Sequence, residues 1–253
     1  MSRIDLFKNA ISEKRAVKII AGIDNFDLDR VKNVVLAATQ AKASAIDISA
    51  KPEIIEMARS LTDLPLIASS IVPEELAKAI ELGADGIELG NFDAMYRNGL
   101  RISASEVLEL TRKTLSLINK SETLFCVTIP GHLSISEQIS LAQSLESLGI
   151  DLIQTEGSAT MEAKSEGARG LLEAAEVSIA NTIELSRNVS LPIMTASGIT
   201  STTAAMAFAA GASAIGVGSA INKLNSSLAM VAAATSIVEI ASNVSSKEVV
   251  LSK

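Results

Sequence analysis

The sequence is poor in the residues that build disulfides, multi-histidine metal sites and aromatic platforms. It has one cysteine, one histidine, one tyrosine and no tryptophan among 253 residues. The single Cys126, within an apolar run, excludes an intrachain disulfide or a cysteine-based zinc site and is expected to be a buried small hydrophobe. Because aromatic residues make up only 2% of the chain, stacking platforms for single-stranded nucleic acid or sugars lack their main component.

The chain also has no excess of positive charge and no long uninterrupted apolar run. Its formal net charge is −7, which argues against a nucleic-acid partner. Residues 1–20 contain no signal-peptide core, and no uninterrupted apolar run reaches the roughly 18 residues that a membrane helix requires. We therefore expect neither a nucleic-acid nor a membrane partner, and a reducing compartment such as the cytosol or the plastid stroma.

Four segments repeat one pattern, in which a helix-like run stops and a short β-branched run follows. Each passes through a small or acidic residue at the junction, and most stop at glycine, which adopts the positive φ that ends a helix. Short helix-to-strand turns of this kind are typical of α/β units. The segments are 40–49, 81–90, 147–157 and 209–219.

Other strands are predicted between these junctions, at 16–23, 64–70, 124–131 and 191–199. Helix-like segments follow the strands; Pro73 opens one, and Ser134 with Glu137 forms a capping box at another. Eight alternating strand and helix units in 253 residues predict one domain, 1–253, that is a single (βα)8 TIM barrel of the phosphate-binding type. The alternative is an open doubly wound sheet.

Two connections are longer than plain barrel turns require. They span 91–102 after the fourth strand and 157–168 after the sixth. Both follow strand carboxyl ends, where barrel active sites are built, so they are candidate lids. The alternative is that they are decoration without function.

Glycine and hydroxyl residues cluster after the last two strands, in "TASGIT" (195–200) and "GVGSAI" (216–221). Barrels often hold a phosphate there, on backbone N–H groups near a helix start. The glycines would let the backbone approach the anion, and the hydroxyls would donate hydrogen bonds; the alternative is that the glycines serve only tight turns and packing. The predicted phosphate-binding residues are Ser197, Gly198, Thr200, Gly216, Gly218 and Ser219.

Charged residues occur at strand positions that should face the barrel lumen. Lys18, Asp47, Glu88 and Glu156 stand among apolar neighbours, and their side chains alternate away from the helix layer. Lys18 and Asp47 come from adjacent strands, so a structural ion pair is one interpretation, and a Schiff-base or proton-transfer lysine is the other. Glu88 and Glu156 lie near strand ends, where they suit acid–base work or would anchor a loop.

His132 follows the fifth strand on the mouth side and is either an acid–base group or a loop residue. No motif supports a metal site, although a carboxylate site for Mg²⁺ using Asp47, Glu88 or Glu156 stays open. Flavin mononucleotide could place its phosphate in the glycine clusters, but no isoalloxazine signature is present, so the cofactor is unknown. Weaker candidates are Asn91, Asp93, Arg97, Lys164 and Arg169.

Five blocks together resemble the hypothetical chloroplast reading frame twenty-three family of algal plastids and cyanobacteria. They are "KIIAGIDNFD", "ADGIELGNFDAMYRNG", "CVTIPGHLSISEQI", "DLIQTEG" and "PIMTASGIT", and the resemblance runs from about Ile4 to Asn222. It implies a single TIM barrel in a cyanobacterial cytosol or plastid stroma. It assigns no catalytic residues.

Three functional hypotheses follow. The first is an aldolase, isomerase or synthase type of enzyme, in which the glycine clusters hold a phosphorylated small metabolite and Glu88, Glu156 or His132 moves protons. The second is a non-catalytic sensor of a phosphorylated metabolite or nucleotide. The third is an assembly protein, in which the alanine-rich last helix (226–243) forms a homo-oligomer contact instead of packing across the barrel.

Overall fold

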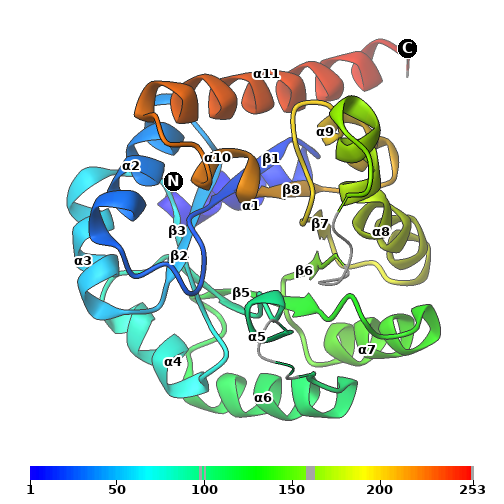
Figure 1. The fold of residues 1–253 in the computed structure, drawn as a ribbon. Helices are drawn as coiled ribbons and strands as arrows, with labels where there is room; N and C mark the ends of the chain where they lie inside the picture. The colour runs from blue at the N-terminus through cyan, green and yellow to red at the C-terminus, as the bar shows by residue number, and fades with distance from the viewer. Residues whose placement is uncertain (97–98, 100, 158–162, 252–253) are drawn as a thin grey trace.

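Eight parallel strands close into one barrel in chain order (Figure 1). The computed structural model describes residues 1–96, 99, 101–157 and 163–251, without the side chains of 93, 94 and 245–251. The closed strand order confirms the TIM barrel and excludes the open sheet. The strands are β1 (Ala16–Ile20), β2 (Ala45–Ser49), β3 (Leu66–Ser70), β4 (Gly86–Leu89), β5 (Leu124–Ile129), β6 (Leu152–Thr155), β7 (Ile193–Thr195) and β8 (Ala214–Val217).

A ring of helices surrounds the barrel (Figure 1). The sequence-predicted helix starts are confirmed: Pro73 is the first residue of α4, and the Ser134 side chain and Glu137 form the capping box of α7. The helices that follow β1 are α2 (Leu28–Gln40), α3 (Pro52–Leu61), α4 (Pro73–Glu81), α5 (Asp93–Tyr96), α6 (Ala104–Leu117), α7 (Ile135–Ser147), α8 (Gly167–Asn188), α9 (Ala204–Ala209), α10 (Ser219–Asn222) and α11 (Ser227–Leu251).

The four repeated junctions share one hydrogen-bond arrangement. At each, the backbone N–H of the small or acidic residue donates to a carbonyl of the preceding odd-numbered strand. In three junctions the side-chain oxygen of the same residue also accepts the N–H of that strand residue, so the two residues are joined twice. The pairs are Ser44 with Val17, Asp85 with Leu66, Asp151 with Phe125 and, through the backbone alone, Ser213 with Ile193.

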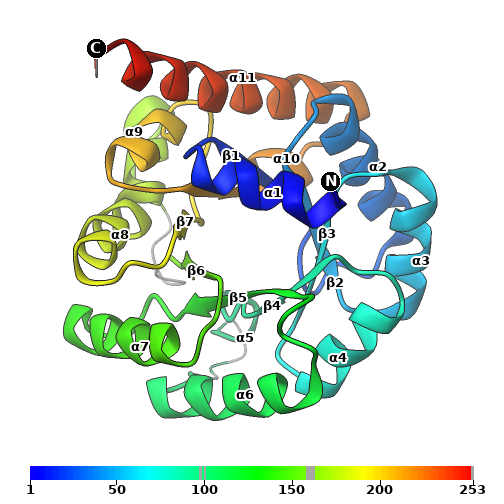
Figure 2. The same cartoon turned by 180° about the vertical axis from the view of Figure 1, so that it is seen from behind.

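An amino-terminal helix, α1 (Arg3–Ser12), closes the end of the barrel opposite the mouth, and the sequence did not predict it. Figure 2 shows it lying across the strands in the view from behind. Phe7 is fully buried and packs with Ile11 on the floor of the barrel, against residues such as Leu124 and Met194. This floor makes the barrel a packed core that opens at the carboxyl ends of the strands.

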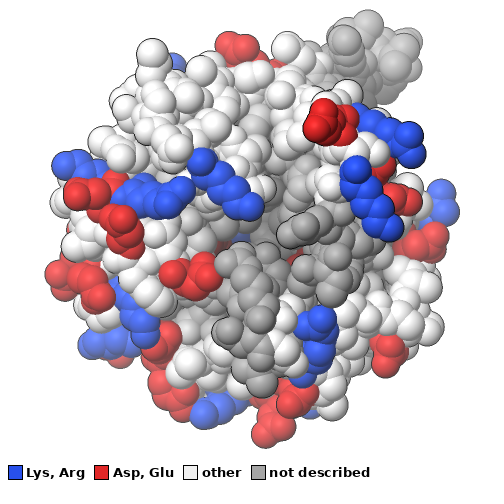
Figure 3. All heavy atoms as spheres, in the orientation of Figure 1, with Lys and Arg blue, Asp and Glu red and all other residues white. Residues whose placement is uncertain are grey.

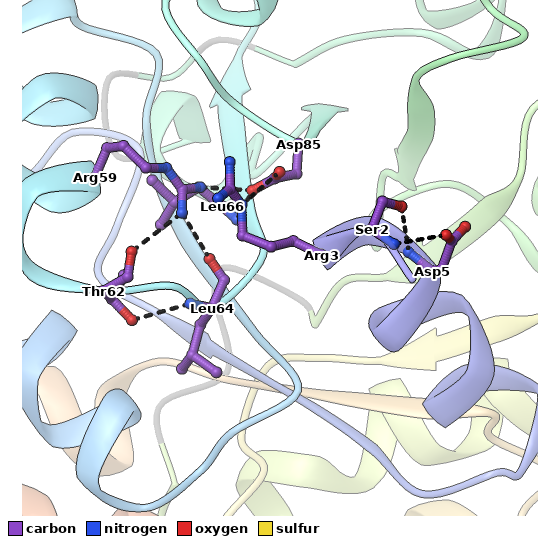
Figure 4. Close-up of polar contacts among 8 residues, drawn as sticks. All are labelled: Ser2, Arg3, Asp5, Arg59, Thr62, Leu64, Leu66 and Asp85. Carbon is purple, nitrogen blue, oxygen red and sulfur yellow. Dashed lines mark hydrogen bonds and ion pairs between the residues drawn. The ribbon is translucent and has the colours of Figure 1, made fainter.

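An ionic cluster around Asp85 ties α1 to the junction before β4 (Figure 4). Arg3 Nε lies 3.0 Å from Asp85 Oδ1, and Arg59 Nη2 from α3 lies 2.5 Å from Asp85 Oδ2. Arg59 also donates to the carbonyl oxygens of Thr62 and Leu64. One acidic junction residue therefore connects α1, the end of α3 and β3.

The carboxyl-terminal helix α11 packs on the outside of the barrel beside α2 and α9 (Figure 1). Met230, Ala234, Ile237 and Ala241 are buried in the main hydrophobic core, which matches the barrel-packing interpretation. The window Ser227–Val244 is nevertheless long and apolar enough, by length and composition alone, to cross a membrane. The sequence prediction counted only uninterrupted apolar runs and missed this window, which contains serine and Glu239; a single such helix is weak evidence for a span.

Candidate functional site

A buried cluster of charges occupies the middle of the barrel lumen. Lys18, Asp47 and Glu88 come from β1, β2 and β4, and each is fully buried. Lys18 Nζ lies 3.1 Å from Asp47 Oδ2 and also donates to Glu88 Oε2. The sequence-predicted pair of Lys18 and Asp47 is therefore present in the structure, with Glu88 as a third member. We call these three residues the lumen triad.

The triad carries one positive and two negative charges away from water. Burial alone would lower the pKa of Lys18, but the charges of Asp47 and Glu88 outweigh burial and raise it above its ordinary value. Burial raises the pKa of Asp47 to about 6, against the attraction of Lys18 and with the repulsion of Glu88. The two carboxylates therefore favour the ammonium form of Lys18, whereas a Schiff-base nucleophile requires the neutral amine.

Glu88 links the lumen triad to the mouth of the barrel. Its Oε1 accepts hydrogen bonds from Gln154 Nε2 at 2.6 Å and from Thr128 Oγ1 and Asn91 Nδ2 at 3.1 Å. Asn91 has a φ of 61°, and it lies just past the end of β4. In the described part of the chain, the buried atoms Asp47 Oδ1 and Gln154 Oε1 have no hydrogen-bond partner. Unsatisfied buried acceptors are uncommon and often mark a functional site.

Glu156 and His132 belong to a second cluster, at the ends of β5 and β6. The Tyr96 hydroxyl donates to Glu156 Oε2 at 2.7 Å, and the Gly131 N–H lies 3.4 Å from the same oxygen. The His132 ring meets the Tyr96 ring edge-on at 5.1 Å, and the Arg101 guanidinium lies 4.6 Å from the centre of that ring. Partial burial lowers the pKa of His132, and the positive charge of Arg101 lowers it further. These contacts tie Tyr96 and Arg101 to the barrel rim.

The loops after β7 and β8 border a cavity of about 270 Å³ at the mouth. Among the sequence-predicted phosphate-binding residues, Ser197, Gly198, Gly218 and Ser219 line it. Thr200 and Gly216 do not. The other lining residues are Ile20, Gly22, Ile23, Asp24, Asn91, Ala196, Ile199, Asn222 and Lys223. We call this space the glycine cavity.

Packing explains two of the predicted glycines without a ligand. A Cβ at Gly198 would lie 2.1 Å from the carbonyl oxygen of Ala174 in α8, and its φ of 75° disfavours other residues. A Cβ at Gly216 would press on Ala196 and Ile20 at 3.0 Å. Gly218 is different, because the nearest atom to an added Cβ is 3.6 Å away. The expectation that Gly198 serves the approach of a phosphate therefore has a competing structural reason.

The backbone N–H groups at the cavity wall indicate an anion site more strongly than the glycines do. Within the residues that the structure describes, the N–H groups of Gly198, Ile199, Gly218 and Ser219 donate to no protein acceptor. Backbone donors are normally paired unless water or a ligand serves them. The helix-like run that follows "TASGIT" in the sequence, from Ser201, becomes helical in the structure only at Ala204, where α9 begins.

A second cavity, of about 430 Å³, adjoins the first over the ends of β2 and β3. The two share Ile23, Asp24 and Asn91 as lining residues. Lys51 and Glu75 lie in the second cavity and pair at 2.6 Å. Sequence reasoning missed Asp24, Lys51, Glu75 and Lys223; Asp24 and Lys51 stand just beyond the strand ends, and that position was the available signal.

Among the weaker candidates, Asn91 lines both cavities, and the other four lie away from both cavities or outside the described residues. Lys164 and Arg169 are exposed, and both contact Glu173, with Arg169 Nε 3.1 Å from its carboxylate. Arg97 and the Asp93 side chain lie outside the described residues. Within the described residues, no group of three or more His, Cys, Asp or Glu side chains is arranged to hold a metal ion. Figure 3 shows basic and acidic side chains interspersed around this face.

Solved structures with the same fold include several enzymes of phosphorylated compounds. The 3-hexulose-6-phosphate synthase of Salmonella typhimurium matches with a TM-score of 0.67 and 13% identity over 90% of this chain and 99% of its own. The (S)-3-O-geranylgeranylglyceryl phosphate synthase of Thermoplasma acidophilum, solved with sn-glycerol-1-phosphate, matches with a TM-score of 0.60 and 17% identity over 96% and 99%. At these identities the likeness concerns the fold alone.

Sequence relatives are much closer. The uncharacterized protein ycf23 of Pyropia yezoensis is 38% identical over 220 residues, which cover 87% of this chain and 80% of the relative. The ycf23 protein of Cyanophora paradoxa is 38% identical over 224 residues, covering 88% and 91%. A family model described as "Protein of unknown function (DUF561)" matches residues 2–250. These matches confirm the resemblance found in the sequence: the chain belongs to the DUF561 family, together with the ycf23 proteins.

Proposed function

We propose that this protein binds a phosphorylated small molecule in the glycine cavity and converts it, as an enzyme of the aldolase, isomerase or synthase type. The observation that carries the proposal is the pair of loop segments at 197–199 and 218–219. Their N–H groups lack protein acceptors within the described residues, and they border one cavity. A phosphate there would satisfy donors that a neutral ligand would leave partly unpaired.

Side chains at the glycine cavity support an anionic group. Ser197 and Ser219 place hydroxyls beside the backbone donors, and Asn222 and Lys223 complete that side of the lining. Lys223 is exposed, so its side chain can move toward a ligand bound in the cavity. The structural neighbours lend further support, since both enzymes named above carry a phosphate in the name of their product or bound substrate.

The proposed chemistry centres on the carboxylates nearest the glycine cavity. Asp24 lines the cavity directly. Glu88 lies beneath it and accepts a hydrogen bond from Asn91, which is also a lining residue. The triad holds more negative than positive charge, and the pKa of Asp47 is raised to about 6 by burial. Asp47 would therefore exchange a proton near neutral pH, as acid–base catalysis requires. Lys18 would hold the carboxylates in place, and Glu156 and His132 would hold the rim.

The burial of the triad favours a second candidate, a non-catalytic sensor. Lys18, Asp47 and Glu88 are fully buried and none of them lines either cavity. A ligand in the glycine cavity would then meet Asn91 and the loops without touching the triad. The two candidates share the ligand and differ only in turnover.

Thermal unfolding with inorganic phosphate, sugar phosphates, nucleotides and flavin mononucleotide tests the binding step. A ligand at about 100 times its dissociation constant stabilises the fold by about 2.7 kcal/mol, which is a shift of roughly 5–11 °C for a chain of this size. Ser219→Asp places a carboxylate beside the proposed phosphate and should abolish the shift. Ser219→Asn is the matched neutral control and should retain most of it. Equal shifts in both variants would place the ligand elsewhere.

Turnover separates the two candidates. For any phosphate compound that binds, Asp24→Asn and Glu88→Gln should abolish conversion while the binding shift persists. Binding without conversion across the panel would support the sensor.

We also propose that the protein works in a cyanobacterial cytosol or a plastid stroma. The ycf23 relatives from Pyropia yezoensis and Cyanophora paradoxa support this setting. Fractionation followed by immunodetection in the source organism would test it, and recovery with membranes would contradict it.

A further inference from the structure

We propose that the ligand has two parts, a phosphate in the glycine cavity and a neutral, partly apolar body in the adjoining cavity over β2 and β3. This inference rests on the proposed function and deepens it, because it assigns a second subsite and narrows the substrate class. The second subsite would select the carbon body, whereas the glycine cavity would select the phosphate.

The two cavities are continuous at the mouth of the barrel. Ile23, Asp24 and Asn91 line both of them, so a ligand that passes these residues occupies both spaces. The second cavity measures about 430 Å³ and the first about 270 Å³. The second alone lies in the range typical of small-molecule sites, roughly 300–1,000 Å³.

Apolar side chains form much of the second cavity. Phe26, Ile71, Val72 and Met95 line it together with Ile23. Phe26 is 56% exposed and Val72 40% exposed, which is unfavourable for residues of this size unless a ligand covers them. Single exposed apolar residues are ordinary on protein surfaces, but several around one hollow indicate a binding site.

Apart from Asp24, which also lines the glycine cavity, the charged residues of the second cavity are paired with one another. Lys51 Nζ lies 2.6 Å from Glu75 Oε1, and the Ser70 hydroxyl donates to Glu75 Oε2 at 2.6 Å. Ser69 donates to Asp47 below. A second phosphate or a carboxylate on the ligand would have to displace Glu75 from Lys51. The pairing therefore favours a neutral body over a bisphosphate or a phosphorylated acid.

Titration calorimetry with a series of n-alkyl phosphates, from methyl to hexyl, tests the second subsite. Each buried methylene group should lower the dissociation constant about four-fold, and the heat-capacity change should become more negative along the series. Phe26→Ala should flatten the dependence on chain length and leave the affinity for inorganic phosphate unchanged. Phe26 is largely exposed, so the variant keeps its fold. Leu28→Ala is the matched control, because Leu28 is also exposed but lies outside the lining, and it should behave as the wild type.

The outcomes separate this inference from the function it rests on. If inorganic phosphate binds and is lost in Ser219→Asp, but chain length has no effect, the second subsite is refuted and the phosphate site stands. A butane bisphosphate that binds more tightly than butyl phosphate would refute the neutral body. If inorganic phosphate fails to bind, or binds equally to Ser219→Asp, the proposed function fails and this inference fails with it.

Discussion

Replacing Lys18 with methionine should be among the most destabilising single changes in the barrel lumen. Methionine has a similar length, so the change removes the ammonium ion with little loss of volume. It leaves Asp47 and Glu88 in a fully buried site without their shared cation, which lies 3.1 Å from Asp47 and also contacts Glu88 in the wild type. Removing one member of a buried ion pair costs about 3–5 kcal/mol, because the remaining charge stays desolvated.

The expected loss is large enough for routine measurement. About 3–5 kcal/mol corresponds to a fall of roughly 6–20 °C in the melting temperature of a domain of this size. Urea denaturation followed by circular dichroism at pH 7 gives the free energy directly. At pH 4.5 the penalty should shrink, because protonation neutralises Asp47, whose pKa burial raises to about 6 in the wild type.

Two companion variants make the experiment decisive. The triple variant Lys18→Met, Asp47→Asn, Glu88→Gln removes all three charges and should recover much of the lost stability, since neutral groups can satisfy one another. Lys78→Met breaks an exposed pair with Glu81 and should change stability little. A loss below about 1 kcal/mol for Lys18→Met, or a triple variant no better than the single one, would refute the assignment of the triad as a mutually compensating buried cluster.

Three further predictions concern other parts of the barrel. Burial raises the pKa of Asp47 from 3.8 to about 6, so the contribution of Asp47 to stability should fall as pH rises from about 4 to 6. Asp47→Asn removes this contribution, and urea denaturation should show the variant gaining up to about 3 kcal/mol relative to wild type across that window. Gly198→Ala should lower the melting temperature by the equivalent of at least about 2 kcal/mol, since its φ is positive and its Cβ meets Ala174, whereas Gly218→Ala should be nearly neutral; equal effects would contradict this. Phe7→Ala should cost about 3–5 kcal/mol by urea denaturation, because Phe7 is fully buried, and a small loss would show that α1 does not seal the floor.

The sequence was informative about the fold because the barrel repeats one local rule. The four junction segments and the alternation of apolar runs predicted every strand and the closed order. The same alternation placed Lys18 and Asp47 in the lumen, since parity along a strand decides which way a side chain points. The helix starts at Pro73 and Ser134 were predictable for the same local reason.

Contacts across the lumen were not predictable in this way. That Lys18 also reaches Glu88, two strands beyond Asp47, depends on barrel curvature and side-chain reach. The role of Gly198 depends on how closely α8 passes behind it, and no local pattern records that distance. The helix α1 was missed because the floor it covers exists only once the barrel has closed.

The glycine clusters depend on both local sequence pattern and contacts that only the folded structure shows. They were predicted to hold a phosphate, which stays a prediction, and Ser197, Gly198, Gly218 and Ser219 line one cavity. Gly216 shared the motif but lies inside the barrel, where packing explains it. A glycine motif alone could not distinguish a wall from a packed interior.

The junction hydrogen bonds divide the ring into four modules of two strands each. Ser44, Asp85, Asp151 and Ser213 each bond back to the strand just before, inside its own module. The turn at 118–123 lies between the second and third modules, so a cut there severs none of these bonds. The two halves, 1–120 and 121–253, would each keep their own junction hydrogen bonds. The chain is therefore suited to fragment complementation, with halves that keep their own junction bonds and meet again at the β4–β5 and β8–β1 edges and through the lumen contacts of Glu88.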